Sequence, residues 1–267
     1  MIVVYHKNNN VVQVMKDQER LSFLSQNIAA VIMEIAQSYP QYWIMWCAIE
    51  LEPFFNKEGL NSIFHHHKIM ASFGINDQSY LPEAIGYVEE SPFIKINKKV
   101  TYPTWQMSSD VGGVFAAVLL QFDENLSTSS DFNYFLHSLA KVAMPKGLIV
   151  YSEPKLVLKN DVKLTCKRTN NYKLFQFVKQ HYRTRWVFLL ILNLVLYQKQ
   201  FPFFPLVRSL FFKNRNRWDI SLDSIQVKSV NDVVKLRTID VIIPTIGREI
   251  YLYNVLKDLS KQTHLPI

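Results

Sequence analysis

Residues 42–49, YWIMWCAI, form a continuous apolar run that ends before the acidic stretch at Glu50. A run of this length without polar alternation is typical of a strand buried on both faces of a sheet. Residues 21–38 precede it and carry apolar side chains at helical spacing, with Pro40 just beyond the end. A central strand preceded by an amphipathic helix predicts an α/β fold.

Further elements follow on both sides of this run. Residues 2–5 and 11–15 predict two short strands around an Asn-rich turn at residues 8–10. The pattern then predicts, in chain order, a helix at 60–67, a strand at 69–73, loops and edge strands at 76–104, an apolar run at 114–122, a helix at 132–143 and a strand at 147–151. The alternation of strands and helices is typical of an α/β unit.

Several common functional classes lack their signatures. The chain has no GxGxxG, GxxxxGK[ST] or GxSxG motif, which disfavours the usual dinucleotide, P-loop and α/β-hydrolase sites. Its two cysteines, Cys47 and Cys166, are too few for a disulfide framework or a CxxC zinc site and suggest a reducing compartment. Adjacent histidines at 65–67 point in different directions on a helix, so we expect no metal site there. The polar start of the chain also argues against a signal peptide, and we expect a cytoplasmic protein.

Positive charge is concentrated in one segment. The formal net charge is +8, yet residues 167–217 contain eleven Lys and Arg and no Asp or Glu. The remaining 19 basic and 22 acidic residues leave the rest of the chain at −3. The sequence therefore predicts a mildly acidic body with one basic segment.

The basic segment also contains long apolar runs. Residues 186–197 are apolar except for Asn193, and 201–207 follow with three phenylalanines. Twelve residues are too few to span a bilayer, which needs ~20. Two interpretations stay open: a buried helix with solvated basic flanks, or a segment at the cytosolic surface of a membrane, where cations meet anionic lipid. Because the aromatics alternate with Leu, Ile and Val, we expect no nucleic-acid partner.

Four acidic residues of the first part of the chain are candidates for catalysis: Asp110, Asp123, Asp131 and Glu153. Each can equally be a helix cap or a surface charge. Asp131 directly precedes the predicted helix at 132–143, so N-capping alone would explain it.

The C-terminal segment predicts a strand at 239–243, a tight turn at 244–248 and an amphipathic helix at 251–259. In that helix Leu252, Val255, Leu256 and Leu259 are expected to face inward. A strand that leads through a polar turn into a helix is the arrangement in which α/β proteins bind nucleotides.

This stretch, IDVIIPTIGREIYLYNVLKDLSKQTHLP at 239–266, resembles the opening strand and helix of family 2 glycosyltransferases. The resemblance implies a GT-A-like fold, which is a Rossmann-type mixed sheet with flanking helices, and a nucleotide-sugar donor. Pro244 and Thr245 would lie against the base and ribose of the donor, with Arg248 nearby. The family's Asp-x-Asp metal motif and catalytic base would follow beyond Ile267. The resemblance thus implies a longer protein, in which Mg²⁺ or Mn²⁺ would be held by ligands outside this chain, so that no metal ligand is assigned here.

A weaker similarity to the late part of a GT-A domain covers residues 122–124, 131–136 and 147–154. It implies a degenerate or metal-independent GT-A-like domain in the first part of the chain, with Asp131 as the base. We therefore expect three parts: an α/β GT-A-like domain at 1–160, a basic aromatic helical segment with a connector at 161–235, and the start of a second α/β domain at 236–267.

Two hypotheses for function follow. In the first, the chain is a glycosyltransferase, or a fragment of one, that transfers a sugar from a nucleotide-sugar donor to a glycan or lipid-linked acceptor. In the second, it is a non-catalytic scaffold or acceptor-binding module, docked on a membrane or on a missing catalytic domain. A pocket without acidic groups around Asp131 would favour the second hypothesis.

Overall fold

The computed structural model describes residues 1–76, 79–89, 96–122, 131–159, 164, 168–215, 220–225, 241–244 and 246–262. The chain divides into two units, Met1–Lys228 and Ser229–Ile267. The expected boundaries at 160 and 235 stay a prediction, because residues 160 and 226–240 lie outside the described residues. The basic helical segment belongs to the first unit because its helices share the hydrophobic core of the α/β part.

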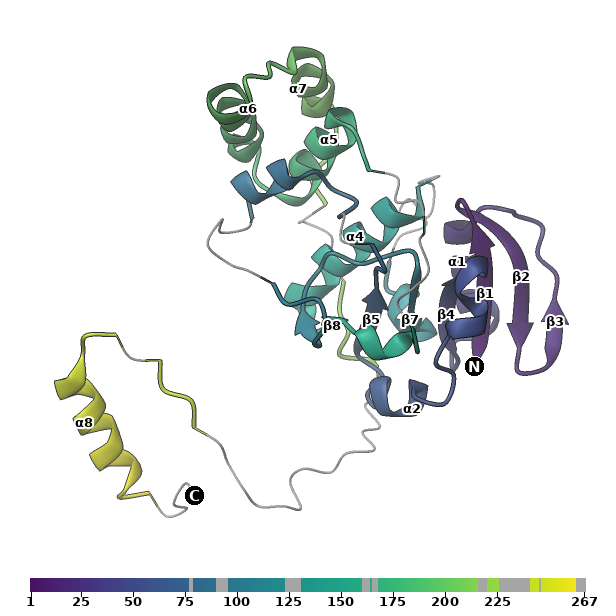
Figure 1. Ribbon diagram of the computed structural model, residues 1–267, viewed down its shortest axis with the longest axis horizontal. Coiled ribbons are helices and arrows are strands. Elements are labelled where there is room, and N and C mark those ends of the chain that lie inside the picture. Colours follow the sequence, from purple (N-terminus) through teal and green to yellow (C-terminus); the bar gives the residue numbers. More distant parts are fainter. Residues whose placement is uncertain are drawn as a thin grey trace. The chain divides into compact units, whose positions relative to one another are not determined.

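The first unit is built on a mixed sheet, to which the described residues contribute eight strands in the order β3-β2-β1-β4-β7-β5-β8-β6. The strands are β1 (Ile2–Lys7), β2 (Asn10–Lys16), β3 (Glu19–Leu21), β4 (Trp43–Ala48), β5 (Ile69–Phe73), β6 (Tyr102–Pro103), β7 (Val111–Phe115) and β8 (Ile149–Ser152). This confirms the predicted α/β class with a mixed sheet and flanking helices (Figure 1).

The directions of the strands place the carboxyl ends of several of them at the same edge of the sheet. β1 pairs with β4 in parallel, and β5 pairs with β8 in parallel. β7 lies between β4 and β5 and is antiparallel to both, so that Val111 at its start is opposite Cys47 and Phe73 near their ends. The carboxyl ends of β1, β4, β5 and β8 and the start of β7 therefore share one edge of the sheet.

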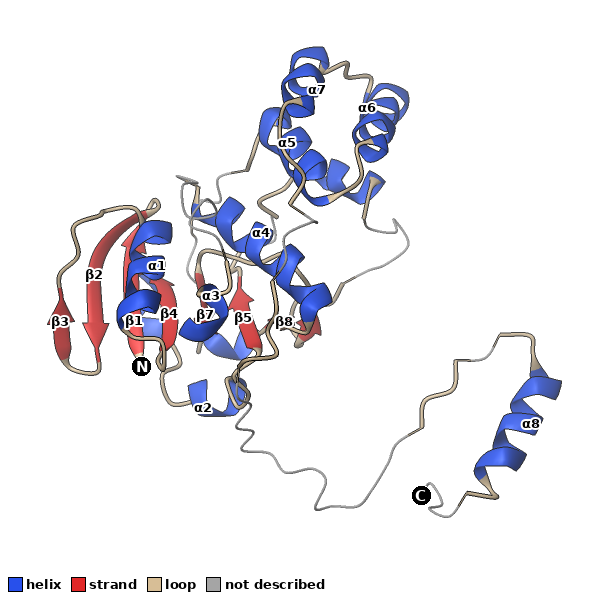
Figure 2. Ribbon diagram, turned by 180° about the vertical axis from the view of Figure 1, so that it is seen from behind, coloured by secondary structure: helices blue, strands red, loops and turns tan. Residues whose placement is uncertain are grey.

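Helices cover both faces of this sheet (Figure 2). The α-helices of the first unit are α1 (Ile28–Ser38), α2 (Leu60–Ile63), α3 (Ala116–Leu119), α4 (Phe132–Ala143), α5 (Asn171–His181), α6 (Arg185–Gln198) and α7 (Phe203–Leu210), with short 3₁₀ turns η1 (Ile49–Phe54), η2 (Glu83–Tyr87), η4 (Met144–Lys146) and η5 (Pro154–Leu156). Side chains of β4 alternate between the faces: Ile44 and Trp46 join the larger core with α1 and α4, whereas Met45 and Cys47 join the smaller core with α2.

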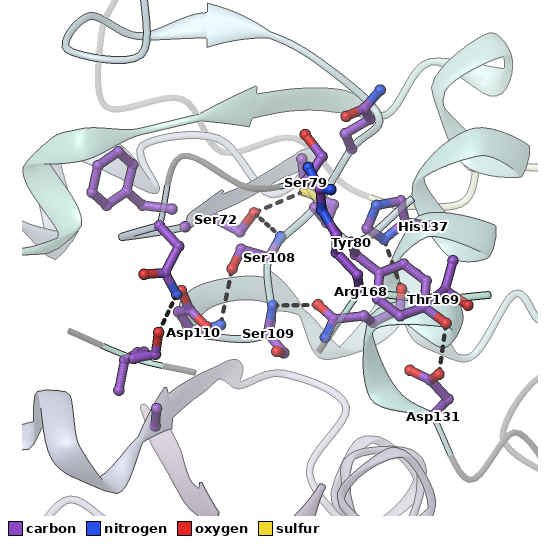
Figure 3. Close-up of a pocket in the computed structure, with 18 of the residues that line it drawn as sticks. Ser72, Ser79, Tyr80, Ser108, Ser109, Asp110, Asp131, His137, Arg168 and Thr169 are labelled. Atoms are coloured by element: carbon purple, nitrogen blue, oxygen red, sulfur yellow. Dashed lines mark hydrogen bonds between the residues drawn. The ribbon is translucent and has the colours of Figure 1, made fainter. Parts of the chain in front are cut away.

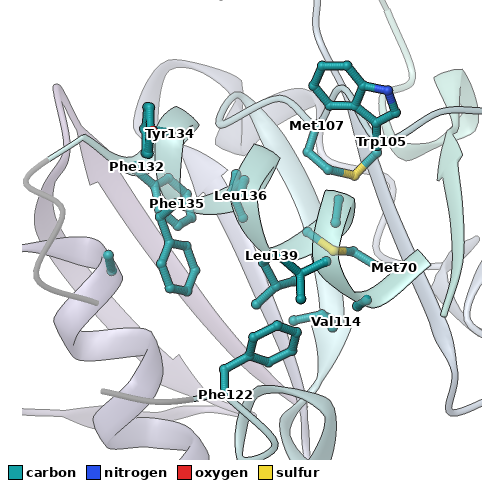
Figure 4. Packing of buried hydrophobic residues seen from close by; sticks show 14 of the residues in the cluster. Met70, Trp105, Met107, Val114, Phe122, Phe132, Tyr134, Phe135, Leu136 and Leu139 are labelled. Atoms are coloured by element: carbon teal, nitrogen blue, oxygen red, sulfur yellow. The ribbon is translucent and has the colours of Figure 1, made fainter. Parts of the chain in front are cut away.

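Helix α4 fills the larger core. Figure 4 shows Leu139 of α4 beside Met70 and Val114 of the sheet, with Phe122 close by. Phe132 and Phe135 of the same helix are fully buried. The core continues into α5 and α6 through residues such as Phe177 and Leu190, which explains why the helical segment does not form a unit of its own.

Gly112 and Gly113 of β7 allow the large side chains of β4 to pack over the centre of the sheet. A Cβ on Gly112 would lie 2.3 Å from Cζ2 of Trp46 and 2.7 Å from the carbonyl oxygen of Ala71. A Cβ on Gly113 would lie 2.3 Å from Sδ of Met45. Trp46 and Met45 therefore occupy the space over β7 that a side chain would need.

Local signals explain where elements differ from the expected bounds. The helix expected at 21–38 begins only at Ile28, because the Asn27 side chain accepts hydrogen bonds from the backbone of Ala29 and Ala30 and caps it. Leu21 pairs with β2 instead, and Leu24 is fully exposed. The apolar run at 114–122 is divided between the end of β7 and helix α3, and the helix expected at 60–67 ends at Ile63.

The second unit has one described helix, α8 (Glu249–Leu259). The amphipathic helix was predicted, but no residue of α8 is buried, so the expected inward face is wrong: Val255 and Leu256 are exposed and Leu252 and Leu259 only half-buried. Of the strand expected at 239–243, residues 239 and 240 lie outside the described residues and 241–243 are not in a strand.

Candidate functional site

A pocket of about 540 Å³ opens at the carboxyl edge of the sheet of the first unit (Figure 3). Strand ends form part of its wall: Lys7 of β1, Ala48 of β4, Phe73 of β5 and Ser152 of β8. Open α/β sheets bind ligands at this edge. The volume lies in the range of sites for small molecules and cofactors.

The side chains that line the pocket carry both signs of charge. The basic ones are Lys7, Lys98, Arg168 and Lys173, and the acidic ones are Glu50, Asp110 and Asp131. Lys7 Nζ lies 3.5 Å from Glu50, but both side chains are more than a third exposed, so solvent weakens this pair. A polar cavity with both cations and carboxylates suits a ligand that has an anionic group and hydroxyls.

Two helix N-termini contribute to the same pocket. Asp131 and Asn133 from the start of α4, and Asn170 and Lys173 from the start of α5, are among the lining residues. Asn170 caps α5 by accepting a hydrogen bond of 3.1 Å from the backbone N–H of Lys173. Helix N-termini carry partial positive charge and favour anions, which adds to the effect of the four cations.

Asp131 lies in the pocket wall at the start of α4. Its Oδ1 accepts a hydrogen bond of 3.3 Å from the backbone N–H of Tyr134, which confirms the N-capping interpretation. Its Oδ2 accepts a hydrogen bond of 2.6 Å from the Tyr80 hydroxyl, to which Figure 3 shows it pointing. Burial, with the negative charge of Asp131, raises the pKa of Tyr80, so this hydroxyl stays protonated and holds the carboxylate in place.

The loop at residues 106–110, directly before β7, lines the pocket. Ser72 Oγ accepts a hydrogen bond of 2.9 Å from the backbone N–H of Ser108, and the Trp46 indole N–H donates to the Ser108 carbonyl at 3.0 Å. The backbone N–H of Ser109 donates to Asn133 Oδ1 of α4 at 3.0 Å. Hydrogen bonds from three elements therefore fix this loop against the sheet and α4.

Asp110 is the last residue of this loop and lines the pocket. Its Oδ2 accepts a hydrogen bond of 3.0 Å from the backbone N–H of Ile75. Burial raises the pKa of its carboxyl group, and the negative charge of Glu50 acts in the same direction, whereas hydrogen bonds to Ile75 and Ser108 oppose the shift. A carboxyl with a raised pKa in a pocket is suited to proton transfer.

Two histidines in the pocket wall, His6 and His137, are uncharged and hydrogen-bond to the backbone. His6 Nε2 donates to the Ser109 carbonyl at 2.8 Å, and His137 Nδ1 donates to the Asn133 carbonyl at 2.7 Å, because a carbonyl only accepts. Burial lowers the pKa of each to about 4. At neutral pH both rings are therefore uncharged and help to fix the loop and α4.

The pocket brings together two of the four acidic candidates, Asp110 and Asp131. Glu153 is buried but lies outside this pocket, where it accepts a hydrogen bond of 2.7 Å from Thr101 and caps η5. Asp123 lies outside the described residues.

The residues assigned from the family resemblance lie in the second unit. Pro244 and Arg248 are exposed there, and Arg248 directly precedes α8 without capping it through its side chain. Thr245 lies outside the described residues. The pocket is lined by residues of the first unit, so these three positions stay a prediction about the second unit.

Sequence reasoning missed several lining residues, among them Lys7, Glu50, Tyr80 and Lys173. Lys7 ends the buried strand β1, and Glu50 lies two residues after β4. A charged residue at the end of a buried strand or within two residues of it was a usable signal for these two. Tyr80 and Lys173 come from a loop and a helix far along the chain, and nothing in their local sequence pointed to the pocket.

The side chains of the described residues do not fit a resident metal ion. Nowhere in the described part of the chain do three His, Cys, Asp or Glu side chains come close enough to hold one. We therefore derive no step through a metal bound by these residues.

Comparison of the chain with protein-family models, curated proteins and solved structures finds no match. The fold and the pocket therefore define the class of protein only as an α/β protein with a polar site at the carboxyl edge of its sheet.

Proposed function

We propose that the chain is a glycosyltransferase, or part of one, that transfers a sugar from a nucleotide-sugar donor to a glycan or lipid-linked acceptor. The donor would bind in the pocket of the first unit. The observation that carries the proposal is the convergence of four cations, three carboxylates and the first turns of two helices on that pocket. The weaker resemblance at residues 122–124, 131–136 and 147–154 to a GT-A domain and the mixed α/β sheet support this site further. The resemblance at 239–266 supports the same activity for the second unit, with Pro244, Thr245 and Arg248 as its proposed nucleotide-binding residues.

The chemistry of sugar transfer needs two kinds of group in one site. The nucleoside diphosphate that leaves is an anion, which Lys173, Arg168 and the N-terminus of α5 would stabilise as its charge develops. The acceptor hydroxyl must lose a proton as its oxygen attacks the anomeric carbon, and a carboxylate is a suitable general base. Asp131 takes this role in the proposal, with Asp110 as the second carboxylate within the pocket.

Asp131 and Asp110 have different hydrogen-bond partners, so a substitution at each position tests its role separately. Asp131 is held by Tyr80 and by the backbone of α4 through separate oxygens. Asp131→Asn keeps the oxygen that accepts from the backbone N–H of Tyr134 and still caps the helix, and its amide N–H can donate to the Tyr80 hydroxyl oxygen in place of the second acceptor. Asp110 has a raised pKa because of its burial. We expect Asp131→Asn to bind the donor as the wild type does and to lose sugar transfer. If Asp110→Asn has that effect and Asp131→Asn keeps its activity, the base is Asp110.

Donor binding can be measured without knowing the acceptor. The full chain is heated with UDP-, GDP-, dTDP- and CMP-sugars and the free nucleotides, each with and without Mn²⁺. A ligand at 100 times its Kd stabilises the folded state by about 2.7 kcal/mol, which corresponds to a Tm increase of roughly 5–10 °C for a unit of this size. Lys173→Met should weaken binding by at least about tenfold through the lost charge-assisted hydrogen bond.

Lys146→Met is the matched control, because Lys146 is exposed and outside the pocket. It should leave the Tm shift unchanged. No shift with any nucleotide or nucleotide sugar would contradict the proposal and leave the non-catalytic module as the alternative. Equal effects of the two lysine variants would place the binding site elsewhere.

A further inference from the structure

Helix α6 is apolar on two sides. Val187, Leu190 and Leu194 are fully buried in the core. Phe188 and Leu192 are about half exposed on the same helix. The core therefore accounts for one side of the apolar run at 186–197, and the other side is open to its surroundings.

The exposed apolar surface continues through the connector into α7. It includes Phe201, Phe203, Phe204, Val207 and Phe211, which we call the aromatic patch. Phe201 is 70% exposed, Phe204 74% and Phe211 84%. Ring centroids of Phe201 and Phe203 are 6.1 Å apart and those of Phe203 and Phe204 are 6.0 Å apart, so these rings form one surface.

The remaining members of the aromatic patch extend this surface along α7. Positions 204, 207 and 211 are three and four residues apart and thus share one side of the helix. Figures 1 and 2 show α6 and α7 together at the end of the first unit beyond α4, away from β1–β3. Large exposed apolar surfaces of this kind mark interaction sites.

Positive charge accompanies the aromatic patch. Lys199 lies in the connector, Arg208 on α7 and Lys213 just after it, and all three are exposed. The sequence from residue 168 to residue 215 contains no acidic residue. An apolar surface on a segment that carries cations and no carboxylates of its own is complementary to a layer with anionic headgroups above an apolar interior.

We propose that the aromatic patch and its basic neighbours dock the protein on an anionic lipid surface. The phenylalanines would enter the boundary between headgroups and acyl chains, and the lysines and Arg208 would contact lipid phosphates. None of the helices in the described part of the chain has the length and hydrophobicity to cross a bilayer. The docking proposal does not depend on the proposed enzymatic function, because the patch and the pocket share no residue.

Vesicle sedimentation of the full chain tests this inference. We expect the protein to pellet with phosphatidylcholine vesicles that contain about 30% phosphatidylglycerol at low salt, and to remain in the supernatant with phosphatidylcholine alone. Binding should weaken at least about tenfold in 0.5 M NaCl, where the Debye length is only a few ångströms.

Two double variants separate the apolar from the electrostatic contribution. Phe201→Ser/Phe204→Ser should reduce binding at least about tenfold through the lost apolar contact. Lys199→Gln/Lys213→Gln should reduce it about thirtyfold, because each basic residue at an anionic surface contributes about fivefold. All four side chains are exposed, so the variants should retain the wild-type Tm.

The matched control is Lys146→Gln/Lys159→Gln, which removes the same charge from exposed positions outside α5–α7. It should change binding less than about threefold. The proposal is overturned if the wild type does not pellet with anionic vesicles, if it pellets equally with phosphatidylcholine alone, or if the control pair loses as much binding as the patch variants. A dimer that Phe201→Ser/Phe204→Ser dissociates, without any vesicle binding, would assign the patch to a second copy of the chain.

Discussion

Acidification should destabilise the first unit through its buried histidines, which are His6, His137 and also His181, whose pKa burial lowers well below 6.5. The pKa of His6 and that of His137 are each lowered by burial from 6.5 to about 4. The unfolded chain therefore binds these protons more readily than the folded one. The stability that each neutral ring contributes is complete above about pH 6.5 and is lost as the pH falls from there toward 4.

The structure explains why protonation is unfavourable. His6 Nε2 already donates to the Ser109 carbonyl, and Nδ1 is buried without a hydrogen-bond partner, so a proton there would create a buried positive charge whose N–H has no acceptor. With pKa values of 6.5 and about 4, His6 and His137 each lower the free energy of unfolding by about 2.5 kcal/mol between pH 7.5 and pH 4.5. The pair together should account for about 5 kcal/mol.

Urea unfolding followed by tryptophan fluorescence at pH 7.5, 6.5, 5.5 and 4.5 measures this loss. His6→Gln will change the free energy of unfolding at every pH. The quantity to compare is therefore the loss of this free energy between pH 7.5 and pH 4.5, which should be about 2.5 kcal/mol smaller in the variant than in the wild type. His66→Gln is the control, since that ring is partly exposed and the pKa shift that burial causes there is modest. The reasoning is refuted if His6→Gln and wild type lose the same free energy, within about 0.5 kcal/mol, over this range.

Three further changes test the packing and the capping. Gly112→Ala should lower the free energy of unfolding by about 3 kcal/mol in urea, because its Cβ would lie 2.3 Å from the Trp46 ring; a loss below about 1 kcal/mol would show that the sheet relaxes. Asn27→Ala should cost about 1 kcal/mol by removing the cap of α1, whereas Asn27→Asp should restore most of it in the same assay. Glu89→Gln should cost about 2 kcal/mol at pH 7, because the Glu89 carboxylate lies 2.6 Å from Lys141 Nζ in a partly buried pair; thermal melts that show no difference from wild type would contradict this.

Much of the fold was predictable because its elements carry local patterns. The helix predicted at 132–143 coincides with α4, since its apolar periodicity and the cap at Asp131 are both local. The strand predicted at 69–73 coincides with β5, and that at 42–49 contains β4. The start of α1 was missed because the spacing of Leu21 and Leu24 imitates a helix, while pairing with β2 and the cap at Asn27 determine the structure.

Most residues of the pocket could not be predicted from the sequence. Asp110 and Asp131 were candidates on their residue type, but any acidic residue near a predicted strand or helix end would have qualified. The cations that line the pocket with them lie between positions 7 and 173 of the sequence. The sheet places Lys7 at the edge, whereas Lys98, Arg168 and Lys173 reach the pocket from loops and from the start of α5, which only the tertiary structure shows. Pro244, Thr245 and Arg248 rest on the resemblance alone and stay a prediction.

By itself the sequence determined the α/β class, most of the elements and the concentration of positive charge in residues 167–217. Periodicity and charge are properties of neighbouring residues, so they can be recognised before folding is known. Only the tertiary structure decided that α5 and α6 join the core of the sheet, that one side of α6 stays exposed, and that a polar pocket forms at the carboxyl edge. Hydrophobicity determines that a side chain tends to leave water, but it does not determine which surface will cover it.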